Sequence, residues 1–257
     1  MTAEFPASGL EELKALGYEP VRVGWGVTRT ALDQRELIVA LDGAEILICE
    51  LEVIDEAVLA AAPDLRLVAS CRGNPTNVDL AAAAAREVVV LSAPGRNAVS
   101  VADFTLALLL AHARRIDRAQ EQLRERGWLV GGVLPYFHFR GPEFDGRTMG
   151  LVGLGAIGRL VATRAGGFGM KVLAHDPFVT EAPPGIELHE LDALLERSDV
   201  VSIHCPLTDQ TRGLIGAREL ALMGPRSILV NTARAAVVDE DALLAALRER
   251  TIAGAAL

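Results

Sequence analysis

The sequence has little of what disulfide-rich, nucleic-acid-binding or membrane-spanning proteins need. Its three cysteines, Cys49, Cys71 and Cys205, lie far apart and form no C-x-x-C motif, a pattern typical of free thiols in a reducing compartment. Lysine and arginine total 25 against 34 aspartates and glutamates, so the net charge of −9 leaves no basic surplus for nucleic acid. The longest mostly apolar run, residues 104–111, is too short to cross a bilayer, and no signal peptide opens the chain. We expect a cytoplasmic protein without metal, nucleic-acid or membrane partners.

What the sequence does contain favours alternating strands and helices. Hydrophobic residues make up 51% of the 257 residues, aromatic residues only 4%, and 24 glycines are spread along the chain. Such Ala-, Leu- and Val-rich composition fits an α/β protein better than an all-β sandwich. We predict two α/β domains, residues 1–96 and residues 97–257.

Residues 1–96 combine helix-capping signals with short apolar runs. Ser8 is predicted to cap a helix that Gly17 ends, and Asp33 with Glu36 has the spacing of a capping box. Two more helices are expected to start at residues 55 and 79. Apolar runs between helices indicate parallel strands covered on both faces, expected at 20–24, 45–49, 65–70 and 88–92.

Residues 98–118 are expected to form one long, mostly buried helix, followed by a surface loop that crosses between the units. A second series of strands and helices is predicted from Met149 onward. Its strands are expected at 149–152, 171–175, 199–204 and 227–231, and its helices at 156–166, 190–196, 217–222 and 239–249.

The clearest motif is Gly153-x-Gly155-x-x-Gly158, which follows a strand and opens a helix. Gly153 permits a tight turn, Gly155 lets the backbone approach a pyrophosphate, and Gly158 allows close helix–strand packing. The free amides and the dipole of the helix then attract negative charge. The motif therefore predicts a dinucleotide site at this turn.

Asp176 ends the second strand of this series, 23 residues beyond Gly153. A carboxylate at this place accepts hydrogen bonds from ribose hydroxyls and repels a 2′-phosphate, so the sequence favours NAD over NADP. S-adenosylmethionine-dependent methyltransferases share a glycine-rich loop followed by an acidic residue, so these two features leave that alternative open.

Two longer stretches remove that ambiguity. Residues 198–257, including "HCPLTDQTRGLIG" and "NTARAAVVDEDAL", closely resemble the D-isomer-specific 2-hydroxyacid dehydrogenases, which include phosphoglycerate, glyoxylate/hydroxypyruvate and D-lactate dehydrogenases. Residues 71–116 resemble the substrate loop, domain crossing and first long helix of the same family. The resemblance covers nearly the whole chain. It implies a flavodoxin-like substrate domain and a Rossmann-type NAD-binding domain with a doubly wound parallel sheet.

The resemblance also implies roles for particular residues. Ala156 and Ile157 match the pair whose backbone meets the pyrophosphate. Arg234 matches the catalytic arginine, and its planar guanidinium suits the carboxylate and carbonyl of a 2-oxo acid. The remaining cofactor-binding residues implied are Cys205, Pro206 and Thr211 on the adenosine side, and Thr232, Ala233 and Arg234 beside the nicotinamide ribose.

The substrate carboxylate is expected to meet the backbone amides of Arg72, Gly73 and Asn74, with Asn97 nearby. Members usually have glycines where this chain has Arg72 and Asn74. The side chain of Arg72 is either a second substrate-binding cation or a salt-bridge partner.

The chain also departs from the family pattern. Members carry a glutamate and then a histidine after the catalytic arginine, and this histidine moves the proton during catalysis. This chain ends 23 residues past Arg234, and none of its five histidines (His112, His138, His175, His189 and His204) stands at the matching place. His204 is expected to be a packing or adenosine-side residue, and His138 a surface residue. We expect a fragment that lacks these two residues and the first strand, with little activity of its own.

Two functional hypotheses follow. The first is an NAD-dependent oxidoreductase that transfers a hydride between nicotinamide and a small D-2-hydroxy acid or its 2-oxo partner. The alternative is a non-catalytic NAD-binding or regulatory protein, or an inactive fragment, derived from the same family. A homodimer is expected, because the "FTLALLLA" stretch of residues 104–111 carries more apolar surface than one domain needs to cover.

Overall fold

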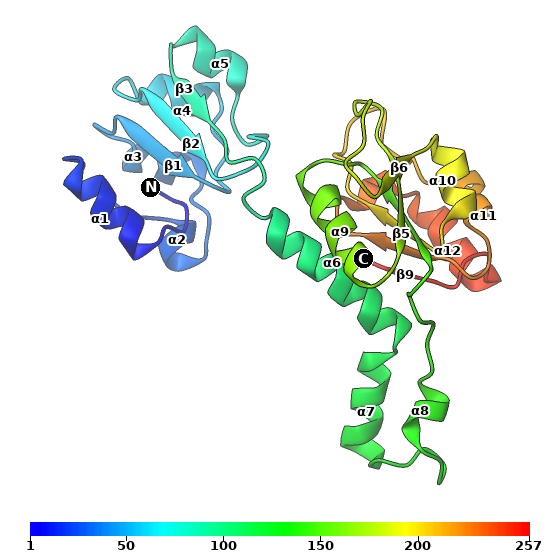
Figure 1. The fold of residues 1–257 in the computed structure, drawn as a ribbon. Coiled ribbons are helices and arrows are strands. Elements are labelled where there is room, and N and C mark those ends of the chain that lie inside the picture. The colour runs from blue at the N-terminus through cyan, green and yellow to red at the C-terminus, as the bar shows by residue number, and fades with distance from the viewer. The chain divides into compact units, whose positions relative to one another are not determined.

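The computed structural model describes residues 1–257 and divides them into two compact units, Met1–Arg96 and Asn97–Leu257 (Figure 1). Each unit contains one sheet whose strands are all parallel, with helices between the strands. The predicted α/β fold class is therefore confirmed. No helix is long and apolar enough to span a bilayer.

The first unit has a sheet of three strands in chain order, β1 (Ile46–Cys49), β2 (Leu67–Ser70) and β3 (Val89–Leu91). Its core includes Leu47 and Val68 on these strands and Val58 on a helix. As predicted, the helices α3 (Gln34–Ala40), α4 (Glu56–Ala61) and α5 (Leu80–Ala85) are each capped by an aspartate side chain that accepts a backbone amide, namely Asp33, Asp55 and Asp79.

The start of the chain extends this sheet without forming a regular strand. The amide of Thr2 donates to the carbonyl of Ile48 at 2.8 Å, and the amide of Val23 donates to the carbonyl of Met1 at 3.1 Å. The resulting order is residues 21–23, residues 1–3, β1, β2 and β3, which corresponds to a flavodoxin-like sheet. The prediction of a regular strand at 20–24 was wrong, because these residues pair with the start of the chain only through hydrogen bonds to Met1.

Helix α1 (Ala7–Ala15) also differs in detail from the prediction. Its N-cap is Pro6, and Ser8 lies inside the first turn instead of capping it. Gly17 ends the helix as expected, with a φ of +90° that glycine adopts without strain. A short helix, α2 (Trp25–Thr28), follows the residues 21–23.

The second unit has a sheet of six parallel strands in the order β6-β5-β4-β7-β8-β9. Counted within the unit, this is the order 3-2-1-4-5-6 of a Rossmann fold, and the direction of winding reverses between β4 and β7. The strands are β4 (Thr148–Val152), β5 (Lys171–His175), β6 (Ile186–Leu188), β7 (Val200–Ile203), β8 (Ile228–Asn231) and β9 (Gly254–Ala256).

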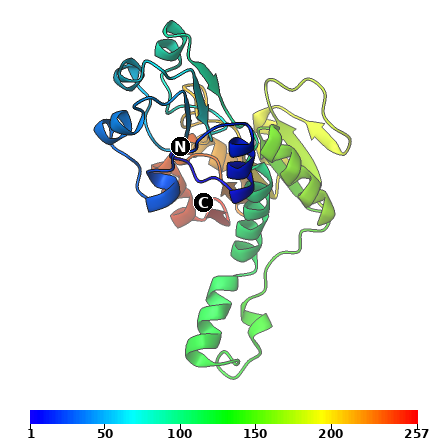
Figure 2. The ribbon, with the colours of Figure 1, turned by 90° about the vertical axis from the view of Figure 1, so that its left-hand side faces the viewer.

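Helices cover both faces of this sheet (Figures 1 and 2). Leu109 and Val161 belong to a core formed with the helices α6 (Ala98–Ala113) and α9 (Ala156–Gly167) on one face. Leu194, Leu220 and Leu243 belong to a second core on the other face. Their helices are α10 (Leu191–Arg197), α11 (Ala217–Met223) and α12 (Glu240–Glu249).

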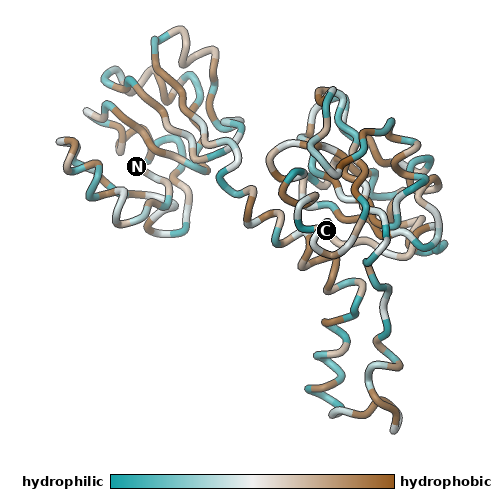
Figure 3. The backbone as a smooth tube through the Cα atoms, viewed as in Figure 1, coloured by the Kyte–Doolittle hydropathy of each residue, from teal (hydrophilic) through white to brown (hydrophobic).

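The long helix predicted for residues 98–118 was partly wrong. It ends at Ala113, because Arg115 adopts a left-handed conformation with a φ of +52°. A separate helix, α7 (Ile116–Arg126), then leads to the short helix α8 (Pro135–His138), where only a surface loop was expected. In Figures 1 and 2 α7 and α8 stand away from the sheet of the unit, and in Figure 3 α7 is largely hydrophilic, unlike the strands.

Candidate active site

The glycine turn lies directly after β4, at the point where the winding of the sheet reverses. Gly153 has a φ of +102°, and a Cβ atom placed there would lie 2.7 Å from the amide nitrogen of Cys205. A Cβ atom at Gly158 would clash with the carbonyl oxygen of Gly153. Both positions therefore require glycine, the first for its conformation and both for the close approach of neighbouring backbone.

Gly155 has a different surrounding. A Cβ atom at this position would meet no atom within 4 Å, so open space lies in front of the turn. Gly155 is the N-cap of α9 and offers no side chain to the first amides of the helix. The amides of Ala156 and Ile157 therefore have no helical acceptor, and the helix dipole adds positive potential. The turn therefore offers the open space and the free amides that the pyrophosphate of a dinucleotide requires.

Asp176 lies beside the same turn, at the end of β5. Its Oδ2 accepts the amide of Leu154 at 2.8 Å, and its Oδ1 accepts the amide of Phe178 at 3.0 Å. The carboxylate forms no ion pair, so both oxygens keep lone pairs for further donors. Its position at the end of β5 suits the ribose hydroxyls of a dinucleotide, and the next two residues, Pro177 and Phe178, carry no cation for a 2′-phosphate.

Two residues after β7 complete this part of the site. Burial raises the pKa of the Cys205 thiol, and the negative charge of Asp176 raises it further. His204 shares its Nε2 with the Oγ of Ser202 at 2.9 Å, while its buried Nδ1 has no partner. Burial lowers the pKa of His204 to about 4, so the ring is neutral at physiological pH. Burial therefore works against a role of His204 as a charged proton donor.

The loop after Cys205 is braced by Thr211. The hydroxyl of Thr211 donates to the carbonyl of Pro206 at 2.6 Å and accepts the amide of Thr208 at 2.8 Å. Thr211 therefore shapes the loop that contains Pro206.

The turn after β8 carries Arg234. Asn231 holds this turn from both sides, because its Oδ1 accepts the amide of Ala233 at 2.9 Å and its Nδ2 donates to the carbonyl of Arg234 at 3.0 Å. The hydroxyl of Thr232 shares a hydrogen bond of 2.9 Å with that of Thr105 on α6. The guanidinium of Arg234 is exposed, bonds only to the carbonyl of Ala233 at 2.7 Å, and forms no ion pair.

A cavity of about 390 Å³ lies beside this turn. Arg234 and Glu240 are the only charged residues that line it, together with apolar groups such as Val238 and Leu243, and none of the five histidines does. The chain also holds no cluster of His, Cys, Asp and Glu that could bind a metal ion. The cavity therefore offers one guanidinium and one carboxylate in a partly apolar pocket that no histidine lines.

The predicted substrate loop of the first unit follows β2. The side chain of Arg72 is engaged within its own unit, because Nε donates to the carbonyl of Glu50 at 2.7 Å and Nη1 to Thr76 at 3.3 Å. Its amide donates to the Oγ of Ser70 at 3.4 Å. The amides of Gly73 and Asn74 make no hydrogen bond in the structure. Asn97 is the N-cap residue of α6, and its side chain makes no capping bond.

The structure thus gathers Gly153, Gly155, Asp176, Cys205 and Arg234 at the carboxyl ends of neighbouring strands of one sheet. Asn231 and Thr105 were missed by the sequence interpretation, although they hold the turn that carries Arg234. A signal existed for Asn231, because it is the one polar residue of the buried strand "ILVN". Thr105 offered none, because its partner is 127 residues away.

A sheet of this order with a glycine turn at its switch point defines a dinucleotide-binding domain. The sequence model of the family described as "D-isomer specific 2-hydroxyacid dehydrogenase, NAD binding domain" matches residues 106–257. YoaD of Bacillus subtilis (strain 168) is 35% identical over 259 residues, which cover 100% of this chain and 75% of YoaD. The chain belongs to the D-isomer specific 2-hydroxyacid dehydrogenase family, and its second unit contains the NAD-binding domain.

Two further comparisons agree with this assignment. D-3-phosphoglycerate dehydrogenase of Mycobacterium tuberculosis (strain ATCC 25618 / H37Rv) is 45% identical over 219 residues, which cover 84% of this chain and 40% of that protein. The crystal structure of the TT0316 protein from Thermus thermophilus has a TM-score of 0.86 and 37% identity, and the match covers 99% of this chain and 79% of that one. The chain therefore spans less than half of some relatives and about four-fifths of others.

Proposed function

We propose that the protein is an NAD-dependent oxidoreductase acting on a small D-2-hydroxy acid or its 2-oxo partner. The observation that carries this proposal is the unpaired guanidinium of Arg234 at the same sheet edge as the glycine turn. A 2-oxo acid carries a carboxylate beside a carbonyl, and a free guanidinium binds such oxygens through charge-assisted, two-pronged hydrogen bonds.

The residues that would hold NAD follow from the geometry of the turn. The amides of Ala156 and Ile157 belong to the first turn of α9, next to the open space at Gly155, and Asp176 offers its carboxylate to ribose hydroxyls. Cys205 and Pro206 border the adenosine side, and Thr232 and Ala233 lie beside Arg234. When bound, NAD supplies the carbon that accepts or donates the hydride.

The chain's own part in catalysis is to bind and orient the acid. Arg234 grips the carboxylate, and as charge grows on the carbonyl oxygen the same cation stabilises it. The amides of Gly73 and Asn74 are predicted to bind the carboxylate too, whereas the side chain of Arg72 is engaged as a brace of its own loop. No histidine lines the cavity beside Arg234, and Glu240 is the only side-chain carboxylate there.

The test is a titration of NAD and NADP into the protein by calorimetry, followed by NADH oxidation with a panel of 2-oxo acids. We expect NAD to bind more tightly than NADP, and residues 1–257 alone to give no more than trace turnover, since general acid–base catalysis contributes about 10²–10⁴-fold. Failure of NAD to bind would overturn the proposal. Rapid turnover would show that a residue within 1–257 moves the proton, and His204 would be examined first.

The alternative is a protein that binds NAD without turning over substrate. It is favoured by one observation, the neutral and buried state of His204, a histidine that borders the glycine turn. Binding of NAD together with unmeasurable turnover in every form that the gene encodes would support this alternative against the enzyme.

We also infer a homodimer in the cytoplasm. Helix α7 has no buried residue, and the segment from α7 to α8 exposes Trp128, Tyr136 and Phe137 by 62%, 59% and 55%. Phe104 on α6 is 55% exposed as well. A second copy presents the same apolar residues and can bury them symmetrically. Sedimentation velocity at micromolar concentrations tests this, and Trp128→Ser with Phe137→Ser should shift the protein to monomer. A wild-type monomer would refute it.

A further inference from the structure

A second and larger cavity of the second unit extends from the opposite edge of the same sheet along α6 and β9 to Leu257, which also lines the cavity beside Arg234. Its volume is about 770 Å³. Arg147 and Asp199 line it from positions directly before β4 and β7, and Arg226 from just before β8. The end of α6 and residues 140–144 complete its wall. Since these strands have four or five residues, about 15 Å of sheet separates this amino edge from the glycine turn.

The charges around this cavity are strongly unbalanced. Five arginines line it (Arg115, Arg118, Arg140, Arg147 and Arg226), against the two carboxylates of Asp117 and Asp199. Only one ion pair forms among them, between Arg147 Nη1 and Asp199 Oδ1 at 2.6 Å. The cavity thus carries a surplus of positive charge in a chain whose net charge is −9. Low-dielectric walls concentrate such a field on small anions.

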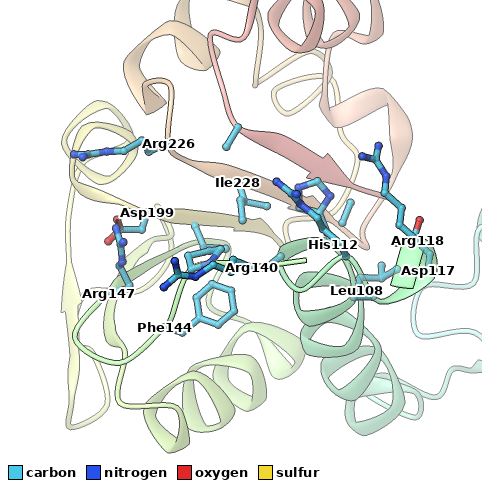
Figure 4. Close-up of a pocket in the computed structure, with 18 of the residues that line it drawn as sticks. Leu108, His112, Asp117, Arg118, Arg140, Phe144, Arg147, Asp199, Arg226 and Ile228 are labelled. Atoms are coloured by element: carbon cyan, nitrogen blue, oxygen red, sulfur yellow. Dashed lines mark hydrogen bonds and ion pairs between the residues drawn. The ribbon is translucent and has the colours of Figure 1, made fainter. Parts of the chain in front are cut away.

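The floor of the cavity is apolar and well packed. Phe144 is 8% exposed and Ile228 is 5% exposed, so both belong to the core of the unit. Figure 4 shows Arg140 between Phe144 and Ile228 in the middle of the view, with the Arg147–Asp199 pair on one side and His112 and Arg118 on the other. Burial lowers the pKa of His112, so its ring adds no positive charge at neutral pH.

We propose that this cavity is a binding site for a small phosphorylated anion, separate from the dinucleotide site. Arg118 and Arg140 form no ion pair or hydrogen bond within the chain, so both guanidiniums are free to bind oxygens. Guanidinium forks match the oxygens of phosphate, and the volume falls within the range of small-molecule sites. The apolar floor suits the carbon skeleton of such an anion.

The experiment uses inorganic pyrophosphate as the probe and calorimetry as the readout, with the protein saturated with NAD. Saturation occupies the glycine turn, which would otherwise bind the probe as well. We expect pyrophosphate to bind, and the variant Arg118→Gln/Arg140→Gln to bind it about tenfold or more weakly, as the loss of charged hydrogen bonds predicts. The control variant Arg35→Gln/Arg248→Gln removes two unpaired, exposed arginines outside the cavity and should bind pyrophosphate as the wild type does.

Absence of binding to the NAD-saturated protein, or equal weakening in both variants, would overturn the proposal. Its outcome does not depend on the proposed enzymatic function. If NAD fails to bind, pyrophosphate can also bind at the glycine turn, but its affinity there does not depend on Arg118 or Arg140. A weaker affinity in Arg118→Gln/Arg140→Gln than in the control variant would therefore still show that the amino-edge cavity binds pyrophosphate.

Discussion

The two edges of the six-stranded sheet are built by different means. At the carboxyl edge, turns of fixed backbone geometry present amides, and glycines at 153 and 158 let them approach closely. At the amino edge, side chains from separate segments surround a cavity, and arginines give this cavity its positive charge. The difference shows that a site made of backbone groups leaves a compact signature in the sequence, whereas a site made of scattered side chains does not.

The largest effect is expected from a pair of substitutions in the glycine turn. Gly153→Ala places a Cβ atom 2.7 Å from the amide nitrogen of Cys205 in a backbone of φ +102°. We expect it to cost about 1–3 kcal/mol of strain alone and to abolish NAD binding. Gly155→Ala meets no atom within 4 Å, so the fold should stay intact while NAD binding weakens. Urea unfolding and NAD titration of both variants measure this.

The prediction for Gly155→Ala would be contradicted if this variant bound NAD with the affinity of the wild type. The open space at this turn would then not receive the pyrophosphate. Gly166→Ala is the matched control, because its Cβ atom also meets nothing and the residue lies near the far end of α9.

A second prediction uses the buried ring of His204, whose pKa is lowered to about 4 from 6.5. Above pH 6.5 both folded and unfolded chains hold the ring neutral, so no stability is lost. As the pH falls from 6.5 towards 4, the unfolded chain takes up a proton that the folded chain does not. The free energy of unfolding should therefore fall, by at most about 3 kcal/mol.

Urea unfolding at pH 7 and pH 5 measures this loss, with His204→Gln as the comparison. The variant lacks the titrating group, so its stability should change less over the same interval. An equal pH dependence in both proteins would assign the effect to other groups, such as His112, whose pKa is also lowered by burial.

These cases also show how far the sequence alone could reach. The strands and helices from residue 149 onward were predicted because apolar runs and caps recur at regular spacing, and Asp176 was assigned from its distance to Gly153. The break at Arg115 was missed because no proline or glycine marks it. The strands β6 and β9 were missed because a strand of three residues is too short to show a pattern in the sequence.

The amino-edge cavity could not be predicted, for a different physical reason. Its arginines are contributed by positions 115 to 226, and their proximity depends on strand order and on the path of residues 140–147. Neither property is encoded in local periodicity. In the same way, the support of the Arg234 turn by Thr105 depends on the packing of α6 against β8.

A third prediction sharpens the role of the carboxyl edge in choosing the cofactor. Asp176→Ala removes the acceptor for ribose hydroxyls and the repulsion of a 2′-phosphate. One charged hydrogen bond is worth about 1.5–3 kcal/mol, so the preference for NAD over NADP should narrow by roughly 10–100-fold. Calorimetric titration of both cofactors into wild type and variant checks this. Equal affinities for the two cofactors in the wild type would contradict it.

The smallest effect is expected from Asp199→Asn, which compares the two edges directly. Asp199 Oδ1 accepts a hydrogen bond from Arg147 at 2.6 Å, and Oδ2 accepts the amide of Thr148 at 3.0 Å. Because both side chains of the pair are partly exposed, its loss should cost only about 1 kcal/mol of stability.

The substitution also frees Arg147 and removes a negative charge from the amino-edge cavity. Pyrophosphate should therefore bind the NAD-saturated variant a few-fold more tightly, while NAD affinity at the opposite edge stays unchanged. Weaker binding of pyrophosphate, or an altered NAD affinity, would show that the two edges do not act as separate sites.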